Sequence, residues 1–472
     1  MILKRNPFRT LGLTALLTLG LGSLAVANER EAQRVQPWNE DPRYWQYRGE
    51  PVILIGASDQ DNLFNHPNIP PHGLSAHLDR IQNAGGNYVR NTMSSRDLEE
   101  NVWPFYRNEV TGLYDLEQFS EEYWDRFKNF LEMTAERDII VQIEVWDRFD
   151  FAREPWNHNP FNPKNNRNYT ANESGLPESI SSHPGQRENT FFQTLPELED
   201  NELLVPYQEA LVRKVFDVSA GYGHVLYCIS NETNDSEEWS AYWADLLRGE
   251  AESRGHGIEV TEMWDPWQLD HPMHERTFDR PDRYSFVDVS QNTHQVGQKQ
   301  WDNLQWARER VADPPRPVNN VKMYGGVHGG GPEEGQHKLW RNILGGTATA
   351  RYHRPGGGIG LNEVTQAHLK SMRRLLQAVD MLAAEPNIDL LHNREDDEVY
   401  MARIPGEQYA LYFPVGGSVE LNLEEVDGSF ELRWLRVLEA EWEEPSVVDA
   451  GQRVALAPPD DDPWAAVLMR QD

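Results

Sequence analysis

The chain reads VLYCISNE over residues 225–232. Its first five residues are apolar, and a short, nearly continuous apolar run is typical of a strand buried in a parallel sheet. The run ends in Asn231 and Glu232, so a carboxylate stands at the carboxyl tip of the predicted strand. Chemistry in α/β barrels takes place at that end of the strands. The stretch therefore predicts a barrel strand with a candidate catalytic residue, Glu232, although a solvated turn residue would give the same pattern.

Similar apolar runs alternate with amphipathic helical stretches between residues 52 and 384. Eight strand-then-helix units predict an α/β fold, and more specifically a (β/α)8 TIM barrel over residues 28–384. An open doubly wound sheet is the alternative, but no glycine-rich phosphate loop follows the first run. The predicted strands cover residues 52–56, 88–92, 139–145, 225–229, 258–263, 286–290, 318–324 and 347–352.

The sequence pattern changes after residue 384. Over residues 385–472 apolar and polar residues alternate, and glycine and proline separate the runs, which predicts a small antiparallel β-sandwich domain with an ancillary role. A different irregular region, residues 149–200, follows the third predicted strand and is rich in Asn, Pro, Gly and Ser. Loops of this length are usually functional or disordered, so we expect it to cap the mouth of the barrel.

The amino-terminal sequence has the features of an export signal. A positive start and an apolar core precede the small residues Ala25 and Ala27, which predicts a signal peptide over residues 1–27 and a secreted or periplasmic protein. The formal net charge of −32 disfavours nucleic acid and anionic membranes as partners. Cys228 is the only cysteine, so no disulfide can form within the chain. We expect no cofactor, and the sequence does not predict the oligomeric state.

Polar and ionisable groups follow most of the predicted strands, as a catalytic mouth requires. A buried charge costs free energy unless it is paired, so such a set favours a function over a purely structural role. Hydrolysis of a glycosidic bond needs two carboxylates, one as acid and one as nucleophile or base. We expect Glu232 to be the acid. The other groups at strand ends are Asp59, Arg90, Glu144, Asp147, Glu262, Asp265 and His294.

Several side chains near Glu232 suit the binding of a carbohydrate. Asn231 can hold a sugar hydroxyl, and Arg90 can tune the charge of the carboxylate. His294 can hydrogen-bond a hydroxyl or the second carboxylate. Exposed indole rings stack on sugars, although most tryptophans fill a core. The candidate stacking platforms are Trp146, Trp264 and Trp267.

Two of these motifs resemble a known clan of enzymes. GGNYVR at residues 85–90 is similar to the second strand, and SNE at residues 230–232 to the fourth strand, of the large retaining glycoside hydrolase clan with (β/α)8 barrels. The chain as a whole resembles secreted bacterial barrels of uncharacterised glycoside hydrolase type, whose C-terminal domain is labelled collagen-binding. YALYFPVGG at residues 409–417 supports that likeness. The resemblance implies a secreted hydrolase of a poly- or oligosaccharide with Glu232 as its acid/base.

One position departs from the clan. The clan's nucleophile is a glutamate at the tip of strand seven, whereas residues 317–326 read PVNNVKMYGG and contain Lys322 but no carboxylate. The second carboxylate can come from another strand, the mechanism can be inverting, or the barrel has lost catalysis and only binds glycan or extracellular matrix. The candidates for the second carboxylate are, in order, Glu262, Asp265, Glu144 and Asp147.

Histidines and arginines near the last two strands leave two further alternatives open. A metal-dependent hydrolase would need several ligands that converge from strand tips, but no His-x-His or His-Glu-x-x-His pair is present, so we expect no metal. His353, Arg351 and Arg354 suit the recognition of an acidic sugar, or they pair with the abundant carboxylates.

Overall fold

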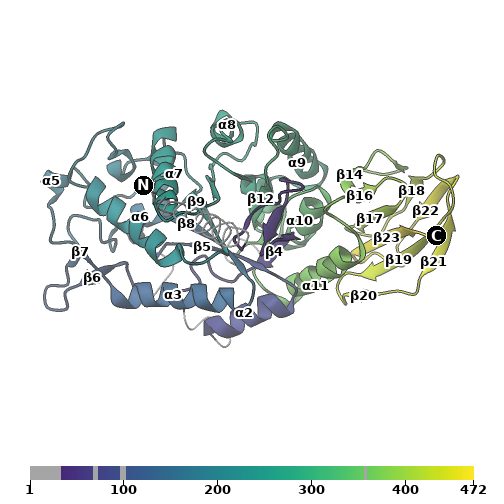
Figure 1. Ribbon diagram of the computed structural model, residues 1–472, viewed down its shortest axis with the longest axis horizontal. Helices are drawn as coiled ribbons and strands as arrows, with labels where there is room; N and C mark the ends of the chain where they lie inside the picture. The colour runs from purple at the N-terminus through teal and green to yellow at the C-terminus, as the bar shows by residue number, and fades with distance from the viewer. Residues whose placement is uncertain (1–32, 67–72, 96–101, 356–358, 472) are drawn as a thin grey trace, which may run out of the picture.

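The computed structural model describes residues 33–66, 73–95, 102–355 and 359–471, and the predicted signal peptide lies outside these ranges. A barrel of strands and helices and a set of antiparallel sheets lie next to each other along the long axis of the molecule (Figure 1). Within the described ranges, no helix has both the length and the apolar character that crossing a bilayer requires.

Eight parallel strands form a nearly closed barrel, which confirms the predicted (β/α)8 fold. The two strands at the ends of this sheet, β10 and β11, are not paired as strands, and isolated hydrogen bonds join their segments. Ser285 N donates to Val260 O at 3.1 Å, and Thr261 Oγ1 donates to Phe286 O at 2.8 Å. In hydrogen-bonded order the strands are β10 (Val260–Thr261), β9 (Val225–Asn231), β8 (Ile140–Asp147), β5 (Tyr88–Thr92), β4 (Leu54–Ala57), β13 (Thr349–Tyr352), β12 (Val318–Met323) and β11 (Val287–Asp288).

Helices cover the outside of the barrel and begin where the sequence provides caps (Figure 1). The hydroxyl of Ser120 accepts from Tyr123 N at the start of α3 (Glu121–Ala135), and Ser236 caps α7 (Glu237–Ser253) in the same way. Both helices have two glutamates in the first turn, where the helix dipole favours negative charge. The other barrel helices are α2 (Gly73–Asn83), α6 (Val205–Ser219), α8 (Pro272–Phe278), α9 (Gly297–Arg310), α10 (Pro332–Leu344) and α11 (Glu363–Ala378).

The long irregular segment after β8 is ordered, and part of it lines the barrel mouth, as predicted. Asparagine side chains take the place of regular secondary structure in it. Asn162 Nδ2, for example, donates to the carbonyl oxygens of Trp156 and Glu178 at 2.9 and 3.0 Å. Its short elements are η1 (Arg148–Phe151), α4 (Arg153–Trp156), α5 (Ala171–Ser174), η2 (Pro184–Gln186) and η3 (Thr190–Gln193).

Small elements complete the barrel. Trp45 is fully buried, and its Nε1 donates to Asn319 Oδ1 and Thr349 Oγ1, both at 3.1 Å. These partners lie near the amino ends of β12 and β13, so the end opposite the mouth is filled by packed side chains. The small elements are β1 (Gln36–Pro37), β2 (Trp45–Tyr47), β3 (Glu50–Val52), β6 (Phe105–Arg107), β7 (Tyr114–Phe119), η4 (Ser290–His294) and η5 (Val327–Gly329).

Two antiparallel sheets form the C-terminal region and share one apolar core. Leu411 and Leu468 from one sheet and Leu421 and Leu456 from the other lie in this core, so the sheets face each other as a sandwich, as predicted. The domain limits stay a prediction. The larger sheet contains β14 (Glu385–Pro386), β16 (Tyr400–Ile404), β17 (Gln408–Phe413), β19 (Ser429–Arg436), β20 (Glu441–Trp442), β21 (Ser446–Asp449) and β23 (Trp464–Arg470), and the smaller contains β15 (Leu391–His392), β18 (Val419–Asn422) and β22 (Arg453–Leu456).

The larger sheet packs against barrel helices α10 and α11. The ring of Trp340 on α10 stacks on Tyr412 of β17, with 4.5 Å between centroids and 3° between planes. His337 Nδ1 lies 2.6 Å from the Tyr412 hydroxyl, and Ser371 Oγ donates to Val437 O at 2.7 Å. All these side chains are buried, so the interface resembles a continuous core rather than a hinge.

We expect Trp340→Ala to lower the free energy of unfolding by about 3–5 kcal/mol, because it empties a large buried site between barrel and sheets. The matched control is Trp306→Ala, since Trp306 is 38 % exposed and its loss should cost well under half as much. Urea unfolding followed by circular dichroism measures both. Equal effects of the two substitutions would contradict the role given to Trp340.

Candidate functional site at the barrel mouth

Glu232 lies where strand β9 ends, and its backbone is unusual. Its φ is +49°, in the left-handed region that residues other than glycine rarely adopt. Such a conformation costs about 1–3 kcal/mol and occurs most often at functional sites. The chain then runs beside the fifth strand, because Thr233 N donates to Met263 O at 2.8 Å. Eight other non-glycine residues of the described ranges share this conformation, so the strained turn supports Glu232 as a functional candidate only together with its place at the tip of a barrel strand.

The carboxylate of Glu232 contacts groups from two other strand ends. Its Oε1 pairs with Nζ of Lys322 on β12, accepts from Gln291 Nε2 at 3.2 Å, and lies 3.5 Å from the hydroxyl of Tyr324. Only 13 % of the Glu232 side chain and 3 % of the Lys322 side chain are exposed. The pair therefore forms a largely desolvated salt bridge between the tips of strands four and seven.

Lys322 sets the charge of Glu232. Burial alone would raise the pKa of this carboxyl, but the charge and hydrogen bond of Lys322, together with the charges of Arg148 and Arg90, outweigh burial, so that the pKa falls to about 2. Burial also acts to lower the pKa of Lys322, yet the Glu232 carboxylate raises it above its ordinary value. Both groups are charged at neutral pH, and Glu232 then carries no proton to donate.

Arg90 links the pair to other carboxylates beneath the mouth. Its Nε donates to Glu144 at 2.5 Å, one terminal nitrogen donates to Asp61 at 2.7 Å, and the other to Asn231 Oδ1 at 2.9 Å. Lys322 Nζ also donates to Asn231 Oδ1 at 3.2 Å. A buried charge is tolerated when it is paired and hydrogen-bonded, and this network meets that condition.

A polar cleft of about 520 Å³ opens above this network. Glu232 and Lys322 lie in its wall, and Asp61, from the turn after β4, supplies a second buried carboxylate. Asp61 pairs with Arg354 at 2.8 Å as well as with Arg90. The lining residues are Asp61, Phe149, Arg153, Glu154, Pro155, Glu232, Lys322, Tyr324, His353 and Arg354.

A row of rings leads from the rim to the cleft. Trp267 is 42 % exposed and stacks on His294, with 4.0 Å between centroids and 14° between planes. His294 is followed by Tyr324 at 5.7 Å, and Tyr324 by His353 at 4.6 Å. Burial lowers the pKa of His294 to about 4, so its ring is neutral at pH 7. Trp267 is thus the one predicted platform with a ring face open to solvent.

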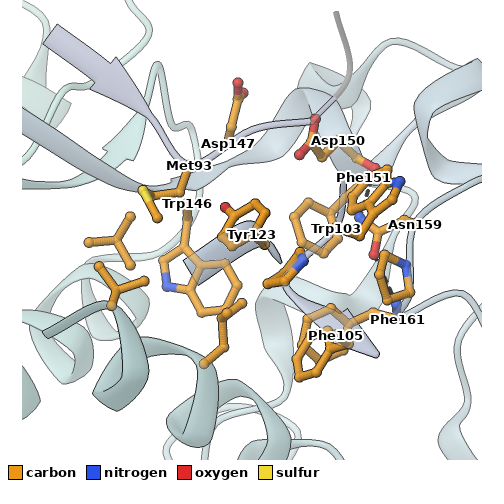
Figure 2. A pocket seen from close by; sticks show the side chains of 15 residues that line it. Met93, Trp103, Phe105, Tyr123, Trp146, Asp147, Asp150, Phe151, Asn159 and Phe161 are labelled. Carbon is orange, nitrogen blue, oxygen red and sulfur yellow. Dashed lines mark hydrogen bonds between the residues drawn. The ribbon is translucent and has the colours of Figure 1, made fainter. Parts of the chain in front are cut away.

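The other two predicted platforms do not reach the mouth. Trp146 is 2 % exposed and packs against Trp239 and Trp243, and Trp264 is 1 % exposed with its Nε1 bonded to Thr277. Figure 2 shows Trp146 directed into an aromatic pocket of about 30 Å³, while its neighbour Asp147 points the other way. Successive residues of a strand face opposite sides, so the prediction that Trp146 stacks on sugar is wrong.

Glu262, the first choice for the second carboxylate, lies away from the cleft. It is completely buried, and its Oε1 accepts from the backbone N–H of Ser230 at 2.8 Å and of Met263 at 2.9 Å. Burial raises its pKa to about 8. The structure therefore gives Glu262 a place behind strands four and five, where a glycosidic bond has no access, and this expectation is corrected.

The remaining predicted carboxylates hold other parts of the protein. Asp59 accepts from Leu361 N at 2.7 Å, and Asp265 pairs with Arg148 at 2.7 Å. Asp147 accepts from Asn231 Nδ2 at 3.1 Å. Glu144 is completely buried against Arg90. None of the four carboxylates, Asp59, Asp265, Asp147 and Glu144, lines the cleft, so they hold neighbouring groups in place and do not face a ligand.

Several residues at the mouth were not predicted as site residues, and three of them illustrate the reasons. Tyr324 stands two positions after Lys322, on the same face by strand alternation, and that spacing was a usable signal. Asp61 shares its turn with Asp59, and nothing in the sequence indicates which of the two faces the cleft. Gln291 lies on η4, a 3₁₀ turn that has no sequence pattern of its own.

In the described ranges, no three His, Cys, Asp or Glu side chains come together as a metal site requires. The histidines near the cleft instead stack with other rings, as His294 and His353 do.

Comparisons with known proteins support the fold. No protein-family model and no curated protein matches the sequence. A glycoside hydrolase of family 5 from Bacteroides vulgatus matches with TM-score 0.61 and 14% identity over 94% of each chain. Another solved glycoside hydrolase gives 0.61 and 12% over 94% of this chain and 99% of that one. An α-amylase from Geobacillus thermoleovorans, solved with acarbose, gives 0.52 and 12% over 89% and 98%. The chain therefore shares the fold of barrel glycoside hydrolases.

We expect Lys322→Met to raise the pKa of Glu232 from about 2 to above the ordinary 4.5, because burial then outweighs the remaining arginines. Carbon-detected NMR titration of the side-chain carboxyl, assigned with Glu232→Gln, measures the change. Lys370→Met, at an exposed position on α11, is the control and should leave that pKa alone. A Glu232 pKa that stays near 2 without Lys322 would contradict the electrostatic account.

Glu262 predicts a pH dependence of stability. Its folded pKa of about 8 exceeds the ordinary 4.5, so the folded protein keeps a proton that the unfolded chain loses between these values. The free energy of unfolding should therefore fall as pH rises through that window, by at most about 1.4 kcal/mol per pH unit from this group. In urea titrations from pH 5 to 8, the free energy of unfolding of Glu262→Gln should fall less steeply than that of the parent protein. Parallel curves for the two proteins would refute the raised pKa of Glu262.

Proposed function

We propose that the mouth of this barrel binds a poly- or oligosaccharide without cleaving it by the two-carboxylate route. The observation that carries the proposal is the salt bridge between Lys322 and Glu232 in the wall of the polar cleft. It fixes hydrogen-bonding groups for sugar hydroxyls, and the exposed ring of Trp267 adds an apolar face at the rim. Glycan-binding sites combine such rings with fixed polar groups.

The same salt bridge argues against Glu232 as a general acid. An acid must hold a proton at working pH, and active sites achieve this by raising the pKa of a carboxyl. Here Lys322 lowers it instead. Lys322 also occupies the strand-seven position from which the resembled clan supplies its nucleophile. Glu232 therefore holds no proton to act as the acid, and Lys322 provides no carboxylate to act as the nucleophile.

Hydrolysis remains a second candidate because Asp61 and Glu232 line one cleft. In that case Glu232, already ionised, would be the base or nucleophile, and the proton for the leaving oxygen would have to come from a group other than Asp61, which pairs with Arg90 and Arg354. The acarbose complex of the structurally similar amylase is consistent with either function, since acarbose is a carbohydrate ligand of that protein. Export through residues 1–27 and an ancillary role of the C-terminal sheets belong to this proposal as well.

We expect a glycan array to detect binding that yields no new reducing ends on the same samples. Trp267→Ala should weaken that binding about tenfold, because a stacking contact contributes about 0.5–1.5 kcal/mol beyond the apolar area that it buries, and about 1.4 kcal/mol is a factor of ten in affinity. Trp306→Ala, another exposed tryptophan, is the control and should bind normally.

Two results would decide against the binding proposal. New reducing ends that disappear in both Glu232→Gln and Asp61→Asn would establish the hydrolase instead. Absence of binding to every glycan, with no reducing ends formed, would reject both candidates and leave the shared fold without carbohydrate function.

A further inference from the structure

The acidic groups of the cleft are each held by another side chain. Glu232 pairs with Lys322, and Asp61 pairs with Arg90 and Arg354. The carboxylate of Glu154 lies next to His158, with 2.6 Å between Glu154 Oε1 and His158 Nε2. Their charges are thus directed to protein partners before any ligand arrives.

Arg153 is the exception among the charged groups of the lining. It is exposed, and no carboxylate of the described ranges pairs with it. Its φ is +53°, so its backbone carries the same kind of strain as Glu232. Arg153 thus brings a guanidinium without a counter-ion to the wall of the cleft, in a chain whose formal net charge is −32 and where acidic residues outnumber Lys and Arg 76 to 44.

Arg354 presents a second guanidinium to the same cleft. It follows β13, whereas Arg153 belongs to the segment after β8, so the two come from different sides of the barrel mouth. The Arg354 side chain is 27 % exposed, and its Nε forms an ion pair with Asp61 at 2.8 Å. A guanidinium has five N–H donors in a planar fork, which suits carboxylate and sulfate oxygens.

We propose that the glycan bound in this cleft carries an anionic group, a carboxylate or a sulfate ester, and that Arg153 with Arg354 holds it. The inference rests on the proposed binding function and specifies its ligand class. The anion supplies the counter-charge that Arg153 lacks. The negative surface elsewhere disfavours anions in general, so selectivity comes from this local pair of cations.

The test compares a charged and a neutral ligand on the same sugar backbone and adds a sulfated ligand on a different backbone. Isothermal titration calorimetry would use trigalacturonate, its neutral methyl ester, and a sulfated carrageenan oligosaccharide. The parent protein should bind one or both anionic ligands at least about tenfold more tightly than the ester, and high salt should weaken that binding. Preference for galacturonate identifies a carboxylate, and preference for carrageenan identifies a sulfate.

Substitutions of Arg153 test whether this residue causes the preference for the anionic ligand. Arg153→Gln should lose about tenfold or more in affinity for the anionic ligand and less than about twofold for the ester, while Arg153→Lys recovers part of the loss. Arg48→Gln is the matched control, because Arg48 is also exposed with φ of +54° but pairs with Asp138 at the opposite end of the barrel.

The outcomes separate this inference from the function on which it rests. Equal affinity of the parent for galacturonate and its ester, or unchanged anion binding by Arg153→Gln, overturns the anionic-ligand inference and leaves glycan binding intact. Failure to bind any glycan, in the titrations and on an array, overturns both.

Discussion

The contact between the ammonium of Lys322 and the carboxylate of Glu232 decides what the mouth of the barrel can do. It joins the tips of strands four and seven, where barrel glycosidases of the resembled clan place two carboxylates. A cation at one of these positions replaces repulsion by attraction, so Glu232 stays ionised instead of holding a proton. Under the proposed binding function, this pair gives the wall of the cleft hydrogen-bonding groups with defined positions in place of two reactive carboxylates.

Such a pair depends on the surrounding barrel. Two largely buried charges lose hydration, and they persist only where further hydrogen bonds satisfy their remaining donors and acceptors. Asn231 receives a bond from Lys322 and one from Arg90, while Arg90 also binds Asp61. The nearly closed ring of parallel strands brings these residues from four different strands to one place, which no local segment of the chain could do.

Much of the fold could be predicted from the sequence, because the barrel strands are buried along their whole length and several of them, such as β9, begin as apolar runs. The site could be predicted only in part. Glu232 could be predicted because it ends an apolar run. The side of a strand that a residue faces, however, depends on the register of the strand. Trp146 and Asp147 are neighbours with opposite surroundings, and Glu262 follows a strand of two residues, too short to show alternation. Asp61 lies in a turn, where no period exists.

The most direct test of this account is a crystal structure of the protein with an oligosaccharide bound in the cleft. The account predicts uncleaved glycosidic bonds, a sugar ring against Trp267, and Lys322 still in contact with Glu232. A cleaved product, or a bond between Glu232 and a sugar carbon with Lys322 displaced, would contradict it.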